Sequence, residues 1–234
     1  MPDNAVLRLR AERLAKSTRP YLARGSRVIR CQGCLLPKRN CLCSHISPQQ
    51  ATSRFALVMF DTEPLKPSNT GRLIADVLPD TQAFMWSRTE VDPALLEALA
   101  DTTRQAYVVF PGSFVEPPRE VFTSLPPGGK PPLFIMLDGT WNEARKMFRK
   151  SPYLDGLPVF SLDVSAKSSY VLRESPRADQ HCTVEVAAAL LEKAGDLAAA
   201  QSLSALFERF RTQYLAGKPH HPVHQLTAIC DESL

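Results

Sequence analysis

Long hydrophobic runs are missing from this 234-residue sequence, in which no apolar stretch approaches the roughly 20 residues that cross a bilayer. The first segment, MPDNAVLRLRAERLAKSTRP, alternates basic and apolar residues and lacks the continuous apolar stretch of a signal peptide. Internal repeats and low-complexity tracts are also absent. With 44% hydrophobic and 22% charged residues, the composition is that of an ordinary globular protein. We therefore expect a cytoplasmic protein with no membrane partner.

Acidic residues are scarce at the start of the chain, where Asp3 and Glu12 are the two that precede Cys43. Ten basic residues give this segment a net charge of +8, whereas the remaining 18 basic and 22 acidic residues give −4. The ten are Arg8, Arg10, Arg13, Lys16, Arg19, Arg24, Arg27, Arg30, Lys38 and Arg39. A basic segment on a mildly acidic body is typical of a nucleic-acid partner, although a solvated helix face would have the same composition.

Apolar segments of strand length alternate with helical segments along most of the chain. The expected strands lie within 55–60, 82–86, 106–113, 133–141 and 159–164. The expected helices are 4–18, 72–78, 93–102 with Asp92 as its cap, 142–151, 183–195 and 196–217. This alternation predicts an α/β fold around a mainly parallel sheet. Ligands of such sheets lie at the carboxyl ends of the strands, which here lead into loops 61–71, 110–115 and 138–142.

Four cysteines lie within thirteen positions, in the spacing C-x2-C-x6-C-x-C formed by Cys31, Cys34, Cys41 and Cys43. Thiols stay reduced in the cytosol, so this cluster indicates a metal site rather than disulfides. Four thiolates fill the tetrahedral shell of Zn²⁺ and leave no position open for water, which predicts a structural zinc ion. Two alternatives are an iron–sulfur cluster and buried cysteines without a ligand, and His45 offers a substitute ligand.

The remaining metal-ligand residue types are scattered. Cys182 and Cys230 are far from the cluster in sequence, and we interpret each as an ordinary thiol. His220, His221 and His224 follow a Gly-Lys-Pro sequence, which is more typical of a surface tail than of a metal site.

Several motifs occur together in a characteristic order: the cysteine pattern, KPSNTGRL (66–73), LDGTWNEARKM (137–147) and CTVE (182–185). Together they resemble the DTW-domain family, which is named after an Asp-x-Thr-Trp motif present here as Asp138, Gly139, Thr140 and Trp141. Within that family the sequence is most similar to bacterial tRNA-uridine aminocarboxypropyltransferases.

The resemblance implies a SPOUT-like, knotted α/β fold and a specific reaction. The 3-amino-3-carboxypropyl group of S-adenosylmethionine would move to N3 of a uridine in tRNA. On this basis we expect a basic helix and zinc-binding segment over residues 1–50 and a catalytic domain over 51–234, in a monomer or homodimer. Two alternatives are S-adenosylmethionine-dependent RNA methyl transfer by the same fold, and a non-catalytic, zinc-dependent RNA-binding module.

The expected S-adenosylmethionine site joins two strand-end turns to the start of a later helix. Its residues are Phe110, Pro111, Gly112, Ser113, Leu137, Asp138, Gly139, Thr140, Trp141, Thr183 and Glu185. Gly112 lets the backbone approach a nucleoside, and Trp141 is either a flat stacking face or a core anchor. Glu185 would contact the amino group of the co-substrate or serve as an acidic residue in the first turn of a helix.

Asp138 is the candidate catalytic residue, because a carboxylate at the strand end can accept the proton of uracil N3. It could instead bind the ribose or cap the helix expected from Asn142. The donor-rich loop 66–72 would bind phosphate or form an N-cap turn through Asn69 or Thr70. The predicted RNA contacts are Lys66, Ser68, Asn69, Thr70, Arg72, Arg145, Lys146, Arg173, Arg10, Arg13, Lys38 and Arg39.

Overall fold

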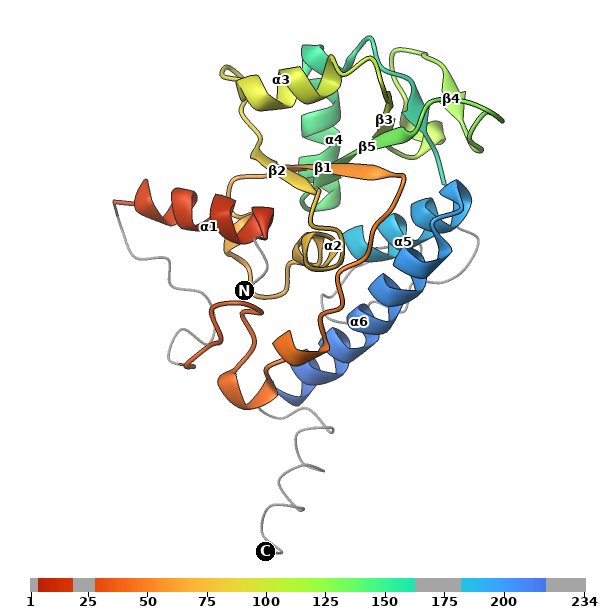
Figure 1. Ribbon diagram of the computed structural model, residues 1–234. Coiled ribbons are helices and arrows are strands. Elements are labelled where there is room, and N and C mark those ends of the chain that lie inside the picture. Colours follow the sequence, from red (N-terminus) through yellow and green to blue (C-terminus); the bar gives the residue numbers. More distant parts are fainter. Residues whose placement is uncertain (1–3, 19–27, 163–181, 218–234) are drawn as a thin grey trace, which may run out of the picture.

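The computed structural model describes residues 4–18, 28–162 and 182–217, and within them the chain builds a six-stranded sheet (Figure 1). The sheet order is β2-β1-β5-β3-β6-β4, and every neighbouring pair is parallel. The strands are β1 (Arg54–Met59), β2 (Gln82–Met85), β3 (Gln105–Val109), β4 (Val121–Phe122), β5 (Pro132–Asp138) and β6 (Val159–Phe160). The predicted α/β class with a parallel sheet is therefore confirmed.

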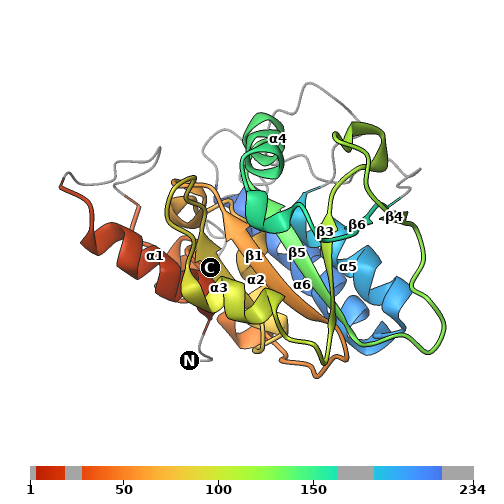
Figure 2. The same cartoon turned by 90° about the horizontal axis from the view of Figure 1, so that it is seen from above.

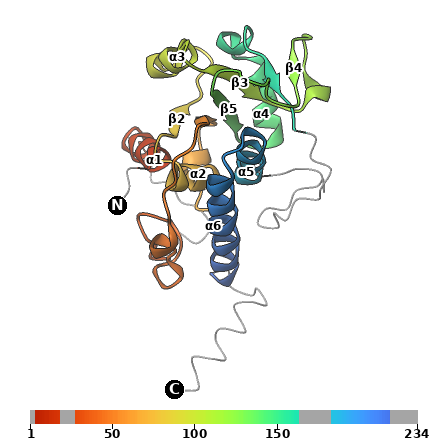
Figure 3. The same ribbon diagram turned by 45° about the vertical axis from the view of Figure 1, so that its right-hand side comes forward.

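Helices cover both faces of this sheet. They are α1 (Ala5–Ala15), α2 (Gly71–Val77), α3 (Pro93–Leu99), α4 (Trp141–Arg149), α5 (Thr183–Ala194) and α6 (Leu197–Ala216). Figures 1 and 3 show α3 and α4 on one face and α2, α5 and α6 on the other, with α1 beside the β2 edge, and Figure 2 shows the same arrangement from above. Short 3-10 turns join them: η1 (Lys38–Asn40), η2 (Cys43–His45), η3 (Glu63–Leu65), η4 (Gly112–Phe114) and η5 (Pro152–Leu154).

Alternation of side chains along the strands explains this three-layer arrangement. In β1, Phe55, Leu57 and Met59 join the hydrophobic cluster beneath α2, α5 and α6, while Ala56 and Val58 join the cluster beneath α3 and α4. A strand buried on both faces needs a continuous apolar sequence, which is what FALVM supplies.

Capping residues set the ends of the helices. Asn4 accepts hydrogen bonds from the first turn of α1, and Asp92 caps α3 as predicted. Thr140 and Glu143 form a capping box at α4. Gly195, with φ of 83°, ends α5 in the left-handed conformation and allows α6 to begin almost at once.

Helix α1 is joined to the body through buried polar contacts. The Asn4 side chain donates from Nδ2 to the carbonyl oxygen of Arg72 over 3.1 Å and to Oδ1 of Asp76 over 2.7 Å. Val6 and Leu9 are buried on the same side of the helix. The basic helix is therefore held in a fixed orientation against α2.

The cysteine segment also packs against the body, along the C-terminal part of α6 (Figure 3). Its Leu36 and Leu42 belong to the same hydrophobic cluster as Phe207 of α6, and Asn40 donates to the carbonyl oxygen of Gln213 over 3.0 Å. The division of the chain at residue 50 stays a prediction, but residues on both sides of it share one core.

Two expectations differ from the structure in extent. Within the described part of the strand expected over 159–164, which ends at residue 162, only Val159–Phe160 is paired, and it lies between β3 and β4. Strand β4 was not expected, because its two residues lie in a proline-rich segment. The implied SPOUT knot stays a prediction. Among the described helices, none is both long and apolar enough to span a bilayer.

Candidate metal centre and strand-edge site

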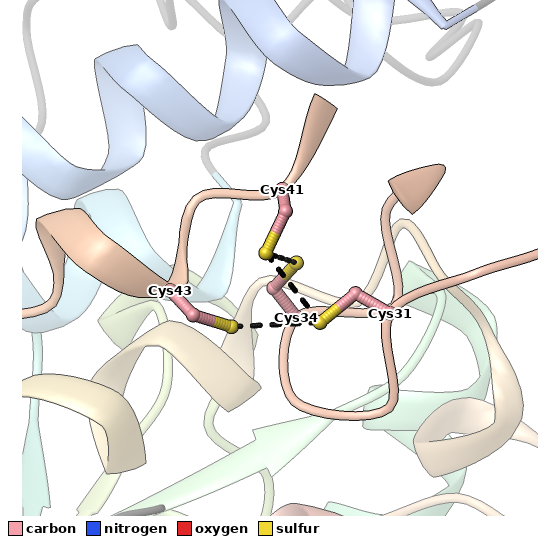
Figure 4. Close-up of side chains that lie close together, drawn as sticks. All are labelled: Cys31, Cys34, Cys41 and Cys43. Carbon is pink, nitrogen blue, oxygen red and sulfur yellow. Dashed lines mark hydrogen bonds between the residues drawn. The ribbon is translucent and has the colours of Figure 1, made fainter. Parts of the chain in front are cut away.

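The four predicted cysteines come together in space, and Figure 4 shows their sulfur atoms pointing toward one another. All four Sγ atoms lie within 4.8 Å of one another. The Cys31 Sγ is 3.6 Å from that of Cys43 and 3.5 Å from that of Cys41, which is 3.8 Å from that of Cys34. Sulfurs bound tetrahedrally at about 2.3 Å from zinc are about 3.8 Å apart. The cluster can therefore hold a metal ion such as zinc.

A tight turn between Cys31 and Leu36 forms the first half of this cluster. The Leu35 amide donates to the Cys31 carbonyl over 2.9 Å, and the Cys31 amide donates to the Leu36 carbonyl over 2.8 Å. Leu35 adopts a φ of 58°, which a branched side chain rarely takes outside a constrained turn. Turns η1 and η2 then bring Cys41 and Cys43 back to the same point.

The environments of the thiols differ. Burial raises the pKa of Cys31, but hydrogen bonds from the backbone of Cys34 and Gly33 outweigh it and lower the value to about 6. Burial raises the pKa of Cys34 and of Cys43. A bound cation would favour the thiolate form of all four, because metal ligation requires deprotonated sulfur.

Asp138, the last residue of β5, lies at the carboxyl edge of the sheet, level with Met59 of β1. Its Oδ2 accepts a hydrogen bond from Nδ2 of Asn69 over 2.8 Å, and its Oδ1 accepts one from Oγ1 of Thr183 over 2.6 Å. The residue is only 2% exposed. A Cβ on Gly71 would lie 2.6 Å from Oδ2, so the backbone of α2 approaches the carboxylate closely. One buried side chain thus connects β5, the loop before α2 and the start of α5.

The structure corrects one alternative for Asp138. The first turn of α4 is capped by Thr140, whose Oγ1 accepts from the Glu143 amide over 3.4 Å, while Glu143 Oε2 accepts from the Thr140 amide over 2.7 Å. Asp138 therefore does not cap this helix, which begins at Trp141 rather than Asn142. Glu185 accepts from the Cys182 amide over 2.9 Å, in agreement with its interpretation as a first-turn residue.

Aromatic rings surround the predicted co-substrate turns. Trp141 lies parallel to Phe110, with ring centroids 5.6 Å apart, and meets Phe114 edge-on at 5.0 Å. The Gly112 amide donates to Oγ of Ser161 over 2.9 Å, which fixes the turn after β3. A hollow beside these turns is lined by Phe110, Ser113, Phe114, Glu116, Arg145, Phe148 and Arg149.

The loop before α2 is more buried than its sequence indicated. Asn69 and Thr70 are 2% and 4% exposed, and Oδ1 of Asn69 accepts a hydrogen bond from the Arg72 amide over 3.0 Å. Lys66 forms an ion pair with the buried Glu63 and stays partly exposed, as does Ser68.

Arg72 requires a correction. Its side chain is 1% exposed, forms an ion pair with Asp76 and lies over the ring of Phe210. The charged group is inside the molecule, so it does not present itself to an RNA phosphate. The sequence alone could not show this burial. Asp76 lies on the same helix as Arg72, but Phe210 does not.

The other predicted RNA contacts are divided among several surfaces. Lys38 and Arg39 are exposed beside the cysteine cluster, and Arg10 is half-buried on α1. Arg13 forms an ion pair with Asp61 in which Nε and Oδ1 are 2.6 Å apart. Arg173 lies outside the described residues.

Aromatic residues follow three of the strands, and two of them, Phe60 and Trp86, were not predicted as site residues, whereas Phe110 was. Phe60, Trp86 and Phe110 are the first residues after β1, β2 and β3. Phe60 and Trp86 stack with centroids 5.6 Å apart, and Nζ of Lys146 lies 5.6 Å from each ring. An aromatic residue repeated at successive strand ends is the sequence signal that could have identified them.

The fold and the two sites define an α/β protein with a parallel sheet, a four-cysteine cluster and a polar carboxyl edge. A sequence model of the family described as DTW domain matches residues 28–215. The chain belongs to the DTW domain family.

Curated relatives were found in mammals. The chain is 26% identical over 165 residues to tRNA-uridine aminocarboxypropyltransferase 2 of Mus musculus and 25% identical over 165 residues to that of Macaca fascicularis. Each match covers 69% of this chain but only 55% of the relative. The chain therefore spans about half the length of these relatives. No solved structure matches the chain.

Proposed function

We propose that this protein transfers the 3-amino-3-carboxypropyl group of S-adenosylmethionine to N3 of a uridine in tRNA. The observation that carries the proposal is the placement of the DTW motif, with Asp138, Thr140 and Trp141 together at the carboxyl edge of the sheet. This is where ligands of open α/β sheets bind. The names of the two relatives supply the reaction class and the tRNA substrate.

In the proposed reaction, a bond forms between uracil N3 and the Cγ carbon of the methionine part. The bond between that carbon and sulfur breaks, and its electron pair leaves with 5′-methylthioadenosine. The N3 proton must also leave. Because the sulfonium is already an activated leaving group, the protein contributes mainly alignment and proton removal.

The residues at the strand edge fit such a co-substrate in chemical type. Trp141 supplies flat apolar surface and is supported by the buried Phe110 ring, and the turn at Gly112 supplies backbone groups close to the sheet. Pro111, Ser113, Leu137, Gly139 and Thr140 complete the proposed binding segments. S-adenosylmethionine would supply the transferred group and the leaving group.

Asp138 is the proposed proton acceptor. Its Oδ2 accepts a hydrogen bond from Asn69 and its Oδ1 accepts one from Thr183. These two bonds fix the orientation of the carboxylate, whose oxygens are acceptors when ionised. Because Asp138 is only 2% exposed, uracil must come into direct contact with its carboxylate for the N3 proton to be transferred.

The proposed metal is Zn²⁺, held by Cys31, Cys34, Cys41 and Cys43, with a structural role. Four protein ligands leave no position for substrate or water. The metal would stabilise the cysteine segment and hold Lys38 and Arg39 in place next to the end of α6. The SPOUT-like knot is part of the same proposal.

The test uses two preparations of S-adenosylmethionine, labelled in the methyl carbon or in the carboxyl carbon, incubated with the full-length protein and tRNA. Carboxyl label in the tRNA and methylthioadenosine in solution are expected. Methyl label in the tRNA would establish the methyltransferase alternative instead. If zinc-loaded protein bound tRNA but no S-adenosylmethionine by calorimetry, the protein would be an RNA-binding module.

A further inference from the structure

The hollow between η4 and α4 has an exposed aromatic ring and two arginines at its rim. Phe114 is 41% exposed, so part of its ring is accessible to a ligand. The Arg145 guanidinium lies 5.7 Å above its ring, and Arg149 lines the same hollow. Glu116 is the one carboxylate among the lining residues. The rim therefore combines one stacking face with a net positive charge.

Other aromatic rings pack against the inner side of Phe114 and hold it in place. Trp141 meets it edge-on, and Trp141 itself stacks on Phe110, which stacks on Phe148 with centroids 4.2 Å apart. This column of rings runs from the core to the surface, so the exposed ring has a fixed orientation. An immobilised aromatic face can accept a stacked base without a large loss of side-chain entropy.

We propose that this hollow holds an unpaired nucleobase of the RNA next to the reacting uridine, stacked on Phe114, with Arg145 and Arg149 against the flanking phosphates. The inference rests on the proposed function for the identity of the RNA, and it adds Phe114 and Arg149 to the substrate contacts. Base stacking on aromatic rings beside arginines is how proteins bind single-stranded nucleic acid.

Charge decides between this occupant and S-adenosylmethionine. The co-substrate has a sulfonium and an ammonium against one carboxylate, so its net charge is positive. Two arginines repel a cation and attract a polyanion. Arg145 and Arg149 are accompanied by the exposed Lys146 on α4 and by the exposed Lys150 at its C-cap, which extends the positive surface along one helix.

The experiment measures binding of two fluorescein-labelled RNAs, a hairpin with a uridine-containing single-stranded loop and a blunt duplex of equal length. Phe114→Ala should weaken binding of the hairpin roughly tenfold, because stacking of one base is lost. Binding of the duplex should change little. Leu96→Ala, which removes an exposed apolar side chain from α3, is the matched control and should leave both affinities unchanged.

The logarithm of the binding constant falls linearly with the logarithm of the salt concentration. For hairpin binding, Arg145→Gln and Arg149→Gln should each make this slope shallower by about 0.7, the value for one phosphate of a single strand. Arg54→Gln is the control, because it removes an exposed charge at the amino end of β1. Binding of S-adenosylmethionine, measured by calorimetry on the same variants, should remain at the wild-type level.

The outcomes separate this inference from the proposed function. Transfer to tRNA with wild-type hairpin affinity in Phe114→Ala would overturn the stacking site while leaving the reaction intact. Selective loss of hairpin binding in a protein that transfers nothing would support the stacking site and overturn the reaction. Loss of S-adenosylmethionine binding in Phe114→Ala would assign the hollow to the co-substrate.

Discussion

Asn69 donates a hydrogen bond from Nδ2 to Oδ2 of Asp138 over 2.8 Å, and both residues are buried. Through its Oδ1 the same Asn69 accepts the Arg72 amide in the first turn of α2. One amide side chain therefore joins the start of α2 to the carboxyl end of β5. The direction of the Asp138 carboxylate depends on this link as well as on Thr183.

Asp138→Asn tests the charge of this group with little change in shape. The amide can accept from Asn69 and donate to the Thr183 hydroxyl, so both hydrogen bonds can be kept. We expect unfolding free energy within about 1 kcal/mol of wild type, unchanged tRNA affinity and a turnover at least about 100-fold lower. Single-turnover transfer assays and urea denaturation provide the measurements.

Asp138→Ala is the comparison variant, and it should lower turnover as well while leaving tRNA binding largely intact. It also leaves Asn69 and Thr183 without their acceptor inside the protein, so a stability loss of about 1–3 kcal/mol is expected. Transfer by Asp138→Asn at the wild-type rate would exclude a proton-accepting role and leave Asp138 with a positioning role.

Gly71→Ala tests the close approach of α2 to Asp138. A methyl group at this position would lie 2.6 Å from Oδ2 and would displace the carboxylate or the helix. Overpacking of this kind costs about 1–3 kcal/mol of stability, and the displaced carboxylate should reduce turnover. Gly156→Ala is the matched control, because a Cβ there meets no atom within 4 Å.

The measurement combines thermal unfolding with the transfer assay. A normal melting temperature and normal turnover for Gly71→Ala would show that the loop before α2 relaxes freely, which would contradict the fixed geometry described for Asp138.

Cys31→Ser tests the metal centre. Serine is a poor zinc ligand, so the variant should lose bound metal, unfold more easily and bind tRNA more weakly, because the cysteine segment shares the main hydrophobic cluster. Metal content by mass spectrometry and tRNA affinity are the two readouts. His45→Ala should retain the metal, since His45 is outside the cluster of four thiols. Unchanged metal content in Cys31→Ser would refute the site.

Asp196 gives a prediction for acid stability. Its carboxylate accepts the Thr52 amide over 2.8 Å and the Ser53 amide over 2.9 Å, which joins the start of α6 to the segment before β1. Burial raises the pKa of Asp196, but these hydrogen bonds outweigh it and hold the pKa below its usual range. The stabilisation is present above the unfolded pKa of about 3.9 and is lost as the pH falls through the folded value.

Asp196→Asn should therefore lower the unfolding free energy by about 1 kcal/mol at pH 7, an amount reduced by the partial exposure of the group. The difference from wild type should shrink toward pH 3. Asp80→Asn, which removes an exposed carboxylate, should show no comparable loss at pH 7. Equal stability of wild type and Asp196→Asn at pH 7 would contradict the prediction.

Local patterns were sufficient to predict most of the fold. Continuous apolar segments such as FALVM predicted strands of a parallel sheet, and Asp92 before Pro93 predicted the start of α3. The cysteine spacing predicted the grouping of four thiols, because nearby ligands need only a tight turn to meet. Strand β4 could not be predicted, since two residues in a proline-rich segment have no periodicity to detect.

The arrangement of the strand edge was predictable only in part. The DTW motif identified the turn that follows Asp138. No local sequence pattern shows that Asn69 and Thr183 both contact Asp138, because these partners are 69 and 45 residues away. Arg72 illustrates the same limit. Its charge and its polar neighbours indicated an RNA contact, whereas contacts with Asp76 and Phe210 place it in the interior.

The contact between Asn40 and Gln213 has a consequence for the order in which the chain matures. Cys31–Cys43 leave the ribosome long before the last helix, against which they finally pack. If the cysteines bind the proposed metal, its uptake can precede closure of the main hydrophobic cluster, and a loaded cysteine segment would offer α6 a preformed docking surface. A chain made without metal would reach its last helix with this surface still unformed, so metal supply during synthesis would govern the yield of folded protein.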